Sequence, residues 1–179
     1  MSATVLYGWL AQGVVIGALV SLLPLGDKRR IAGLMAILLA LFAGPAALLH
    51  GFVGTPSVTL LLLAIWQLAS RAPTPLDRRA AWSVIGIAAL FYPLALGLGP
   101  FDPYAVGYQP WPLLLAIGTL AVALLRCRRE DWLLILSAGL AGYAGGLFAN
   151  LWDALLDPLL ALAALAVVVG QLTRRRTAG

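Results

Sequence analysis

Residues 132–172 read WLLILSAGLAGYAGGLFANLWDALLDPLLALAALAVVVGQL, a block in which almost every residue is apolar. As one α-helix rising 1.5 Å per residue, this block would be about 60 Å long, roughly twice the hydrocarbon core of a bilayer. The block therefore predicts two membrane-crossing helices, 132–148 and 156–172. The more polar sequence ANLWDALLD, residues 149–157, is the turn between them.

The rest of the chain has the same character. Apolar residues make up 62% of the sequence and charged residues 11%, against about 45–50% and about 25% in soluble domains. Further apolar segments lie at 6–25, 31–49, 55–70, 81–99 and 111–125. We predict an all-α, polytopic membrane protein with seven transmembrane helices, or six as the alternative, in a single integral membrane domain covering residues 1–179. The first segment follows no positively charged region, so we interpret it as a retained span and not a cleaved signal peptide.

The positive charges predict the orientation of the spans. All twelve Lys and Arg residues fall in GDKRR (26–30), RAPTPLDRR (71–79), RCRRED (126–131) and the tail RRRTAG (174–179). The alternate connections contain none: the N-terminus, HGFVGTPS (50–57), GPFDPYAVGYQP (99–110) and ANLWDALLD. Because Lys and Arg accumulate in cytoplasmic loops, this alternation places the N-terminus outside and the C-terminus in the cytoplasm.

The same placement predicts the partners of the basic residues. The net charge of +5 lies in short connections beside a bilayer, where each Lys or Arg gains about 1 kcal/mol from anionic lipid headgroups. We expect the lipid bilayer and these headgroups as partners, and no nucleic acid. The Arg-rich, Lys-poor loops and the abundance of Ala, Leu and Gly suggest a bacterial inner (plasma) membrane.

Small residues and prolines predict how the spans pack. Small residues let transmembrane backbones approach closely, and they recur four apart on two segments: Gly13, Gly17 and Ser21, and Ala138, Gly142 and Gly146. These faces serve either internal packing or a contact with another protein. Pro45 and Pro93 lie inside the second and fourth predicted spans, where each should kink its helix and could open a cavity toward the outside.

Acidic residues on the predicted outer side are the candidates for chemistry. Asn150, Asp153 and Asp157 are spaced i, i+3 and i+7, and would share one face of a continuous helix. Such carboxylates could share a proton, bind a cation, or act as acid and base, and His50 and Asp102 lie on the same side. For Asp157 the alternative is an N-cap preceding Pro158 at the first helical position. For Asp153 the alternative is a solvated loop position.

The connection 99–110 and the residue after it are rich in rings. Tyr104, Tyr108 and Trp111, together with Asn150, are candidates for substrate binding. The alternative for the rings is an interfacial aromatic belt.

Motifs for metal or cofactor chemistry are missing from the sequence. With one cysteine, Cys127, and one histidine, the chain lacks HExxH, CxxC and a bis-histidine haem site, and it has no Walker A loop. We expect no cofactor and no metal. The best-supported function is a non-catalytic accessory or assembly subunit of a membrane complex. The alternatives are a membrane enzyme acting on lipid-linked or periplasmic substrates through an outward Asp/His site, and a small transporter or channel.

Overall fold

The computed structural model describes residues 2–70 and 74–177, with side chains up to residue 172. Within those ranges every regular element is a helix, which confirms the all-α prediction. The α-helices are α1 (Ala3–Val20), α2 (Arg29–Phe42), α3 (Pro45–Val53), α4 (Val58–Ala69), α5 (Arg78–Ala95), α6 (Trp111–Arg126), α7 (Glu130–Ala144), α8 (Leu151–Leu155) and α9 (Pro158–Thr177). Short 3-10 turns, η1 (Gly26–Lys28) and η2 (Ala105–Gly107), lie in two of the connections.

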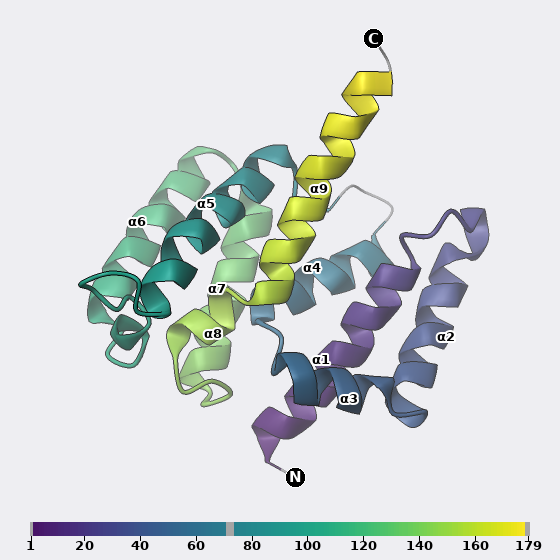
Figure 1. The fold of residues 1–179 in the computed structure, drawn as a ribbon, viewed down its shortest axis with the longest axis horizontal. Coiled ribbons are helices and arrows are strands. Elements are labelled where there is room, and N and C mark those ends of the chain that lie inside the picture. Colours follow the sequence, from purple (N-terminus) through teal and green to yellow (C-terminus); the bar gives the residue numbers. More distant parts are fainter. Residues whose placement is uncertain (1, 71–73, 178–179) are drawn as a thin grey trace.

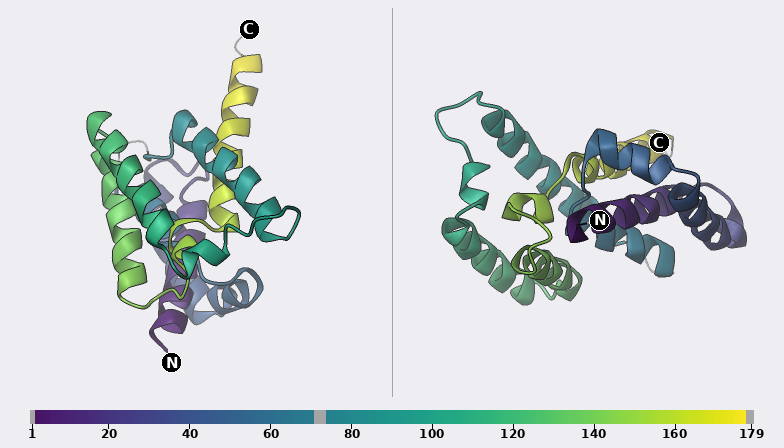
Figure 2. Two further views of the ribbon diagram at one scale, coloured as in Figure 1. Left: turned by 90° about the vertical axis from the view of Figure 1, so that its left-hand side faces the viewer. Right: turned by 90° about the horizontal axis from the view of Figure 1, so that it is seen from below.

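The helix ends gather on two opposite sides of the molecule (Figure 1). The α1–α2 connection, the start of α5, the α6–α7 connection and the end of α9 lie at the top of the view. We call this the basic side, because these connections contain Lys and Arg. The N-terminus, α3 and the α5–α6 and α7–α8 connections lie at the bottom, also in the left view of Figure 2. We call this the acidic side, because its connections contain Asp102, Asp153 and Asp157 and no Lys or Arg.

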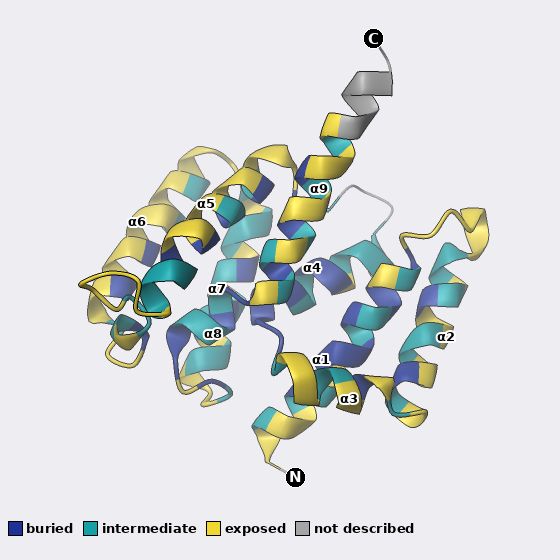
Figure 3. Ribbon diagram, viewed as in Figure 1, coloured by how far each residue is buried: buried dark blue, intermediate teal, exposed yellow. Residues whose placement is uncertain are grey.

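Helix α4 lies at the centre of the packing. It contacts α1, α2, α7, α8 and α9. One cluster of buried apolar side chains joins α1, α4, α5, α7 and α9, and a second joins α4, α6, α7 and α8. The dark-blue ribbon segments in Figure 3, which mark buried residues, accordingly lie mostly where helices face one another, and yellow segments mark the outward-facing residues. Exposed Leu, Ile and Phe side chains on those outer faces suit a lipid environment.

The lengths of the helices support membrane insertion for part of the chain. Among the described residues, two stretches are long and apolar enough to cross a bilayer: Ala3–Val20 and Leu151–Leu172. A third appears if the helices on either side of residues 43–44, which meet at a bend of 76°, form one broken span. Helices α4 and α6 are apolar but shorter, at 12 and 16 residues. The count of seven spans stays a prediction.

The second predicted span, 31–49, is not one helix. Helix α2 ends at Phe42, Gly44 adopts a left-handed conformation with φ 97°, and Pro45 starts α3. Proline suits the first position of a helix, where its missing N–H would have no intrahelical partner. The predicted kink at Pro45 is therefore a break. Pro93 does lie inside α5, as predicted.

The predicted small-residue face of α1 packs within the chain. A Cβ atom added at Gly17 would meet the carbonyl oxygen of Gly33 in α2 at 2.7 Å, and one added at Gly13 would meet Leu41 at 2.7 Å. Ser21 is buried and donates a hydrogen bond to the Ala18 carbonyl at 2.7 Å. The backbones of α1 and α2 thus approach as closely as these residues allow.

The predicted face of α7 is only partly correct. Ala138 packs against the second apolar cluster, and Gly142 faces Val58 of α4, where an added Cβ would lie 3.1 Å from the Val58 side chain. Gly146 lies beyond the end of α7 with φ 74° and has no neighbour within 4 Å of an added Cβ. It belongs to the turn that ends the helix and not to a packing face, because helix α7 stops at Ala144.

On the basic side, one arginine joins two connections. The Arg129 guanidinium donates hydrogen bonds to Asp77 at 3.0 Å and to the Pro75 carbonyl at 3.0 Å. Its hydrogen bond to Asp131 raises the pKa of Arg129, and the nearby carboxylates of Asp131 and Asp77 add to this effect. Arg129 therefore holds the end of the α4–α5 connection against the α6–α7 connection, besides contributing to the positive charge of this side.

Candidate functional site

The site is built around a partly buried, non-helical connection, residues 54–57, between α3 and α4. Side chains from α1 bind its carbonyl groups: Gln12 donates to Gly54 at 2.9 Å, and Tyr7 donates to Pro56 at 3.2 Å. Gln12 is fully buried. Because buried backbone groups need partners, these bonds explain why polar residues occupy the apolar α1 segment.

Asp157 binds the other end of this connection. One carboxylate oxygen accepts the Ser57 N–H at 2.8 Å, and the other accepts the Leu160 N–H at 2.9 Å. The second bond confirms the predicted N-cap of α9, with Pro158 at the first helical position. Asp157 is 7% exposed. Both of its oxygens are thus engaged by backbone groups at the starts of two helices.

His50 does not join the aspartates. Its Nδ1 lies 3.2 Å from the Gly54 carbonyl oxygen, and its ring packs so closely against Gly8 that an added Cβ there would overlap it. In the described part of the chain, no three His, Cys, Asp or Glu side chains are placed so as to hold a metal ion. The structure therefore does not form the mixed carboxylate–histidine site that the sequence allowed.

Asn150, Asp153 and Asp157 also do not share one helix face. Asn150 caps the short α8, Asp153 lies within it, and the chain is extended at Leu156 before α9 begins. Asn150 is fully buried and donates to the Tyr104 carbonyl at 2.9 Å, while its oxygen accepts the Trp152 N–H at 2.9 Å. Its contacts are thus structural, and they tie α8 to the 99–110 connection.

Further contacts complete this attachment. The Trp152 indole N–H donates to the Pro103 carbonyl at 2.9 Å. The η2 turn comes so close to α8 that a Cβ added at Gly107 would overlap the Asn150 side chain. Asp102 accepts the Tyr104 N–H at 2.8 Å and lies exposed, so it stabilises a turn within the connection.

Asp153 lies beside Tyr104 of the 99–110 connection. The Tyr104 hydroxyl donates to Asp153 Oδ2 at 3.0 Å. Burial raises the pKa of Tyr104, and its neighbours Tyr108 and Asp153 raise it further. The hydroxyl therefore keeps its proton, and remains a donor to the carboxylate, throughout the neutral pH range.

Asp153 and Asp157 line one cavity of about 490 Å³. Its aromatic walls are Phe91 and Tyr92 from α5, Tyr104, Phe148 and Trp152. The ring centroids of Phe91 and Trp152 lie 4.6 Å apart with the planes tilted by 46°. Pockets of about 300–1,000 Å³ with apolar walls and a few polar groups are typical ligand sites.

The other predicted ring positions lie outside this cavity. Tyr108 is 55% exposed and packs edge-on against Tyr104, with centroids 5.6 Å apart, and Trp111 is 77% exposed. Both positions fit the interfacial belt better than a binding wall. The sequence did not single out Phe91, in a predicted span, or Trp152, in the predicted 149–157 turn, because neither ring gives a local sign of which distant neighbour it faces.

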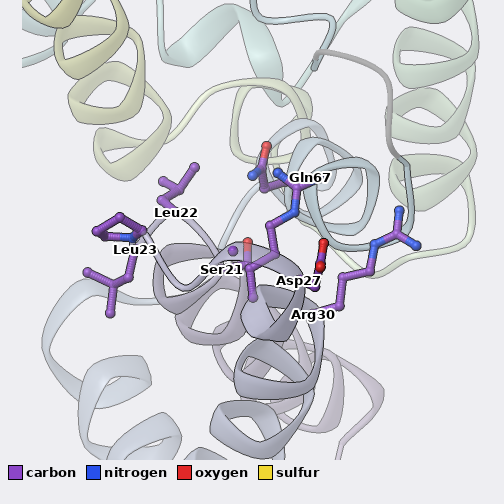
Figure 4. Close-up of a pocket in the computed structure, with 9 residues that line it drawn as sticks. Ser21, Leu22, Leu23, Asp27, Arg30 and Gln67 are labelled. Atoms are coloured by element: carbon purple, nitrogen blue, oxygen red, sulfur yellow. The ribbon is translucent and has the colours of Figure 1, made fainter.

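A second hollow, of about 650 Å³, lies on the basic side. Figure 4 shows Ser21, Asp27, Arg30 and Gln67 around it, and Arg29 also lines it. Arg30 donates to the Ala69 carbonyl at 3.0 Å.

No family model, no curated protein and no solved structure matches this chain.

Proposed function

We propose that the protein is a small multi-pass bacterial inner-membrane protein that acts as a non-catalytic accessory or assembly subunit. In this proposal it crosses the bilayer seven times, with the N-terminus outside and the C-terminus in the cytoplasm. The grouping of all basic connections on one side of the molecule supports this orientation. Anionic lipid headgroups would then lie beside the basic side, where Arg29 and Arg30 line the hollow.

The short helix α4 would be the third of the seven proposed crossings, and its length is compatible with that role. Its 12 residues extend about 18 Å, and the four residues of the 54–57 connection add at most about 13 Å. Together they match the roughly 30 Å hydrocarbon core. Non-helical backbone is tolerated at membrane depth only where protein satisfies it, and Gln12, Tyr7 and Asp157 supply partners for three backbone groups of this connection.

The positions of the catalytic candidates support a non-catalytic role. Asp157 uses both oxygens for backbone N–H groups, Asp102 holds a turn, and His50 lies against α1. Asp153 is the one candidate that faces a cavity with only a tyrosine hydroxyl bound to it. A mechanism that uses a pair of carboxyl groups, as glycoside hydrolysis does, would need a second free carboxylate beside Asp153.

The proposal of a partner rests on two glycines, Gly86 and Gly118. A Cβ atom added at Gly86 of α5 or at Gly118 of α6 would meet nothing within 4 Å, in contrast to Gly17 and Gly33. In membranes, small residues are enriched where two helices approach closely. The α1 glycines are used in this way within the chain, whereas Gly86 and Gly118 are open for a helix of a second membrane protein.

The partner is tested by native mass spectrometry of the protein purified in mild detergent from its own host. We expect a stoichiometric second protein, which Gly86→Leu or Gly118→Leu releases while the thermal stability of the chain is unchanged. Gly51→Leu is the matched control, because its position is equally open but lies on α3. A wild-type chain that is always alone, or a partner retained by both variants, would contradict the proposal.

The orientation is tested with the native cysteine. Cys127 is exposed in the α6–α7 connection. A membrane-impermeant maleimide should label it only after the cells are permeabilised. In a Cys127→Ser background, Ala105→Cys on the acidic side should be labelled in intact cells. The opposite pattern would reverse the proposed orientation.

A further inference from the structure

The charged side chains that line the cavity on the acidic side are all negative. Among its described lining residues, Asp153 and Asp157 are carboxylates, and none is Lys, Arg or His. A concave, low-dielectric wall that carries one sign of charge concentrates ligands of the opposite sign. The two hydrogen bonds to Asp157 use its lone pairs but leave its negative charge.

The rest of the wall selects among cations. Hard metal ions such as Ca²⁺ bind through six to eight oxygen ligands. This wall instead offers rings from Phe91, Tyr92, Tyr104 and Trp152. The faces of aromatic rings attract organic cations within about 6 Å, and their apolar edges accept the alkyl groups that such a cation carries.

One polar atom of the wall has no hydrogen-bond partner. The Tyr92 hydroxyl is buried and has no hydrogen-bond partner among the described residues. Tyr92 lines the same cavity as Asp153. A buried polar atom without a partner is destabilising, so this part of the cavity wall is not fully satisfied by the protein itself.

We propose that this cavity binds an alkylated ammonium group, held by the charge of Asp153 and by the aromatic walls. The group could belong to a free small amine or to the ammonium headgroup of a membrane lipid. The inference goes beyond the proposed accessory role and does not depend on a partner at Gly86 and Gly118.

The test uses the full chain in nanodiscs of phosphatidylglycerol, a lipid without an ammonium group. Choline is the probe, and its uncharged isostere 3,3-dimethyl-1-butanol is the control of equal shape. By isothermal titration calorimetry we expect choline to bind at least about tenfold more tightly than the isostere. Equal affinity, or no saturable choline binding below about 10 mM, would overturn the proposal on the wild-type protein alone.

Variants then assign the binding to the cavity. Asp153→Asn removes the charge but keeps an oxygen that can accept the Tyr104 hydroxyl, and we expect it to weaken choline binding about tenfold. Tyr92→Phe keeps the ring and should leave choline binding nearly unchanged, because the quaternary ammonium cannot form a hydrogen bond with the hydroxyl. Asp102→Asn is the matched control, because Asp102 does not line the cavity, and it should leave the affinity unchanged. Equal affinities of Asp153→Asn and wild type would place binding elsewhere and overturn the assignment.

Native mass spectrometry distinguishes the two sources of the group. Wild-type protein released from mixed nanodiscs should retain phosphatidylethanolamine over phosphatidylglycerol if the ligand is a lipid headgroup, and Asp153→Asn should lose this preference. Choline binding without any lipid preference would identify a free amine. The absence of both choline binding and the preference for phosphatidylethanolamine would refute the inference.

Discussion

Asp157 is the residue whose replacement tests the packing most directly. Its carboxylate connects the start of α4, through the Ser57 N–H, to the start of α9, through the Leu160 N–H. In Asp157→Ala, loss of the α9 cap should cost about 0.5–2 kcal/mol of unfolding free energy. The fully buried Ser57 would keep an unpaired N–H, which costs about 1–3 kcal/mol more. The expected total is about 1.5–5 kcal/mol.

Asp157→Asn separates the two contributions. Its oxygen can still accept the Leu160 N–H, but its NH₂ group would face the Ser57 N–H, so two donors would meet. We expect this variant to lose only the second contribution, about 1–3 kcal/mol. Asp102→Ala is the control. It also removes a carboxylate that accepts a backbone N–H, but in an exposed turn, where substitutions usually change stability by less than about 0.5 kcal/mol.

The assay is reversible unfolding in mixed micelles of mild detergent and dodecyl sulfate, followed by far-ultraviolet circular dichroism. We expect the order of destabilisation to be Asp157→Ala, then Asp157→Asn, then Asp102→Ala. If Asp157→Ala were no less stable than Asp102→Ala, the bond between α9 and the 54–57 connection would not contribute, and this account of Asp157 would be refuted.

Two further predictions concern glycines. Gly107→Ala should destabilise the protein by about 1–3 kcal/mol, because its methyl group overlaps Asn150. Limited proteolysis should then cut the 99–110 connection faster than in wild type, and an unchanged cleavage rate would contradict the close approach. Gly17→Ala should lower the thermal unfolding temperature, because its Cβ meets the Gly33 carbonyl oxygen. Gly118→Ala, where a Cβ meets no atom, should not lower it. Equal shifts for the two variants would contradict the α1–α2 packing.

Several features of this structure follow from residues that are close together in the sequence. The apolar runs predict helices, and the alternating charge predicts which connections lie together. Asp157 followed by Pro158 predicts the cap of α9, because an N-cap bond joins residues only three apart. Ser57 caps α4 in the same way, and a polar residue just before an apolar run is the signal by which it could have been found.

Local patterns also produced the errors. The hydropathy of 31–49 does not change at Gly44, so a continuous span was predicted where a left-handed glycine and a following proline end one helix and begin another. The spacing of Asn150, Asp153 and Asp157 suits a helix that in fact breaks at Leu156. Gly146 fits a small-residue repeat that extends past the end of α7.

The candidate site itself depends on tertiary structure. Sequence alone determined the helical class and the separation of the charges, and it offered the capping role of Asp157 as one of two interpretations, since each depends on neighbours within a few residues. Tertiary structure decided that Asp157 binds Ser57, 100 residues away, and that Tyr104 binds Asp153, 49 residues away. It also decided that His50 lies against α1. Such contacts depend on which faces of distant helices pack together, and a nearly uniform apolar sequence contains little information about that choice.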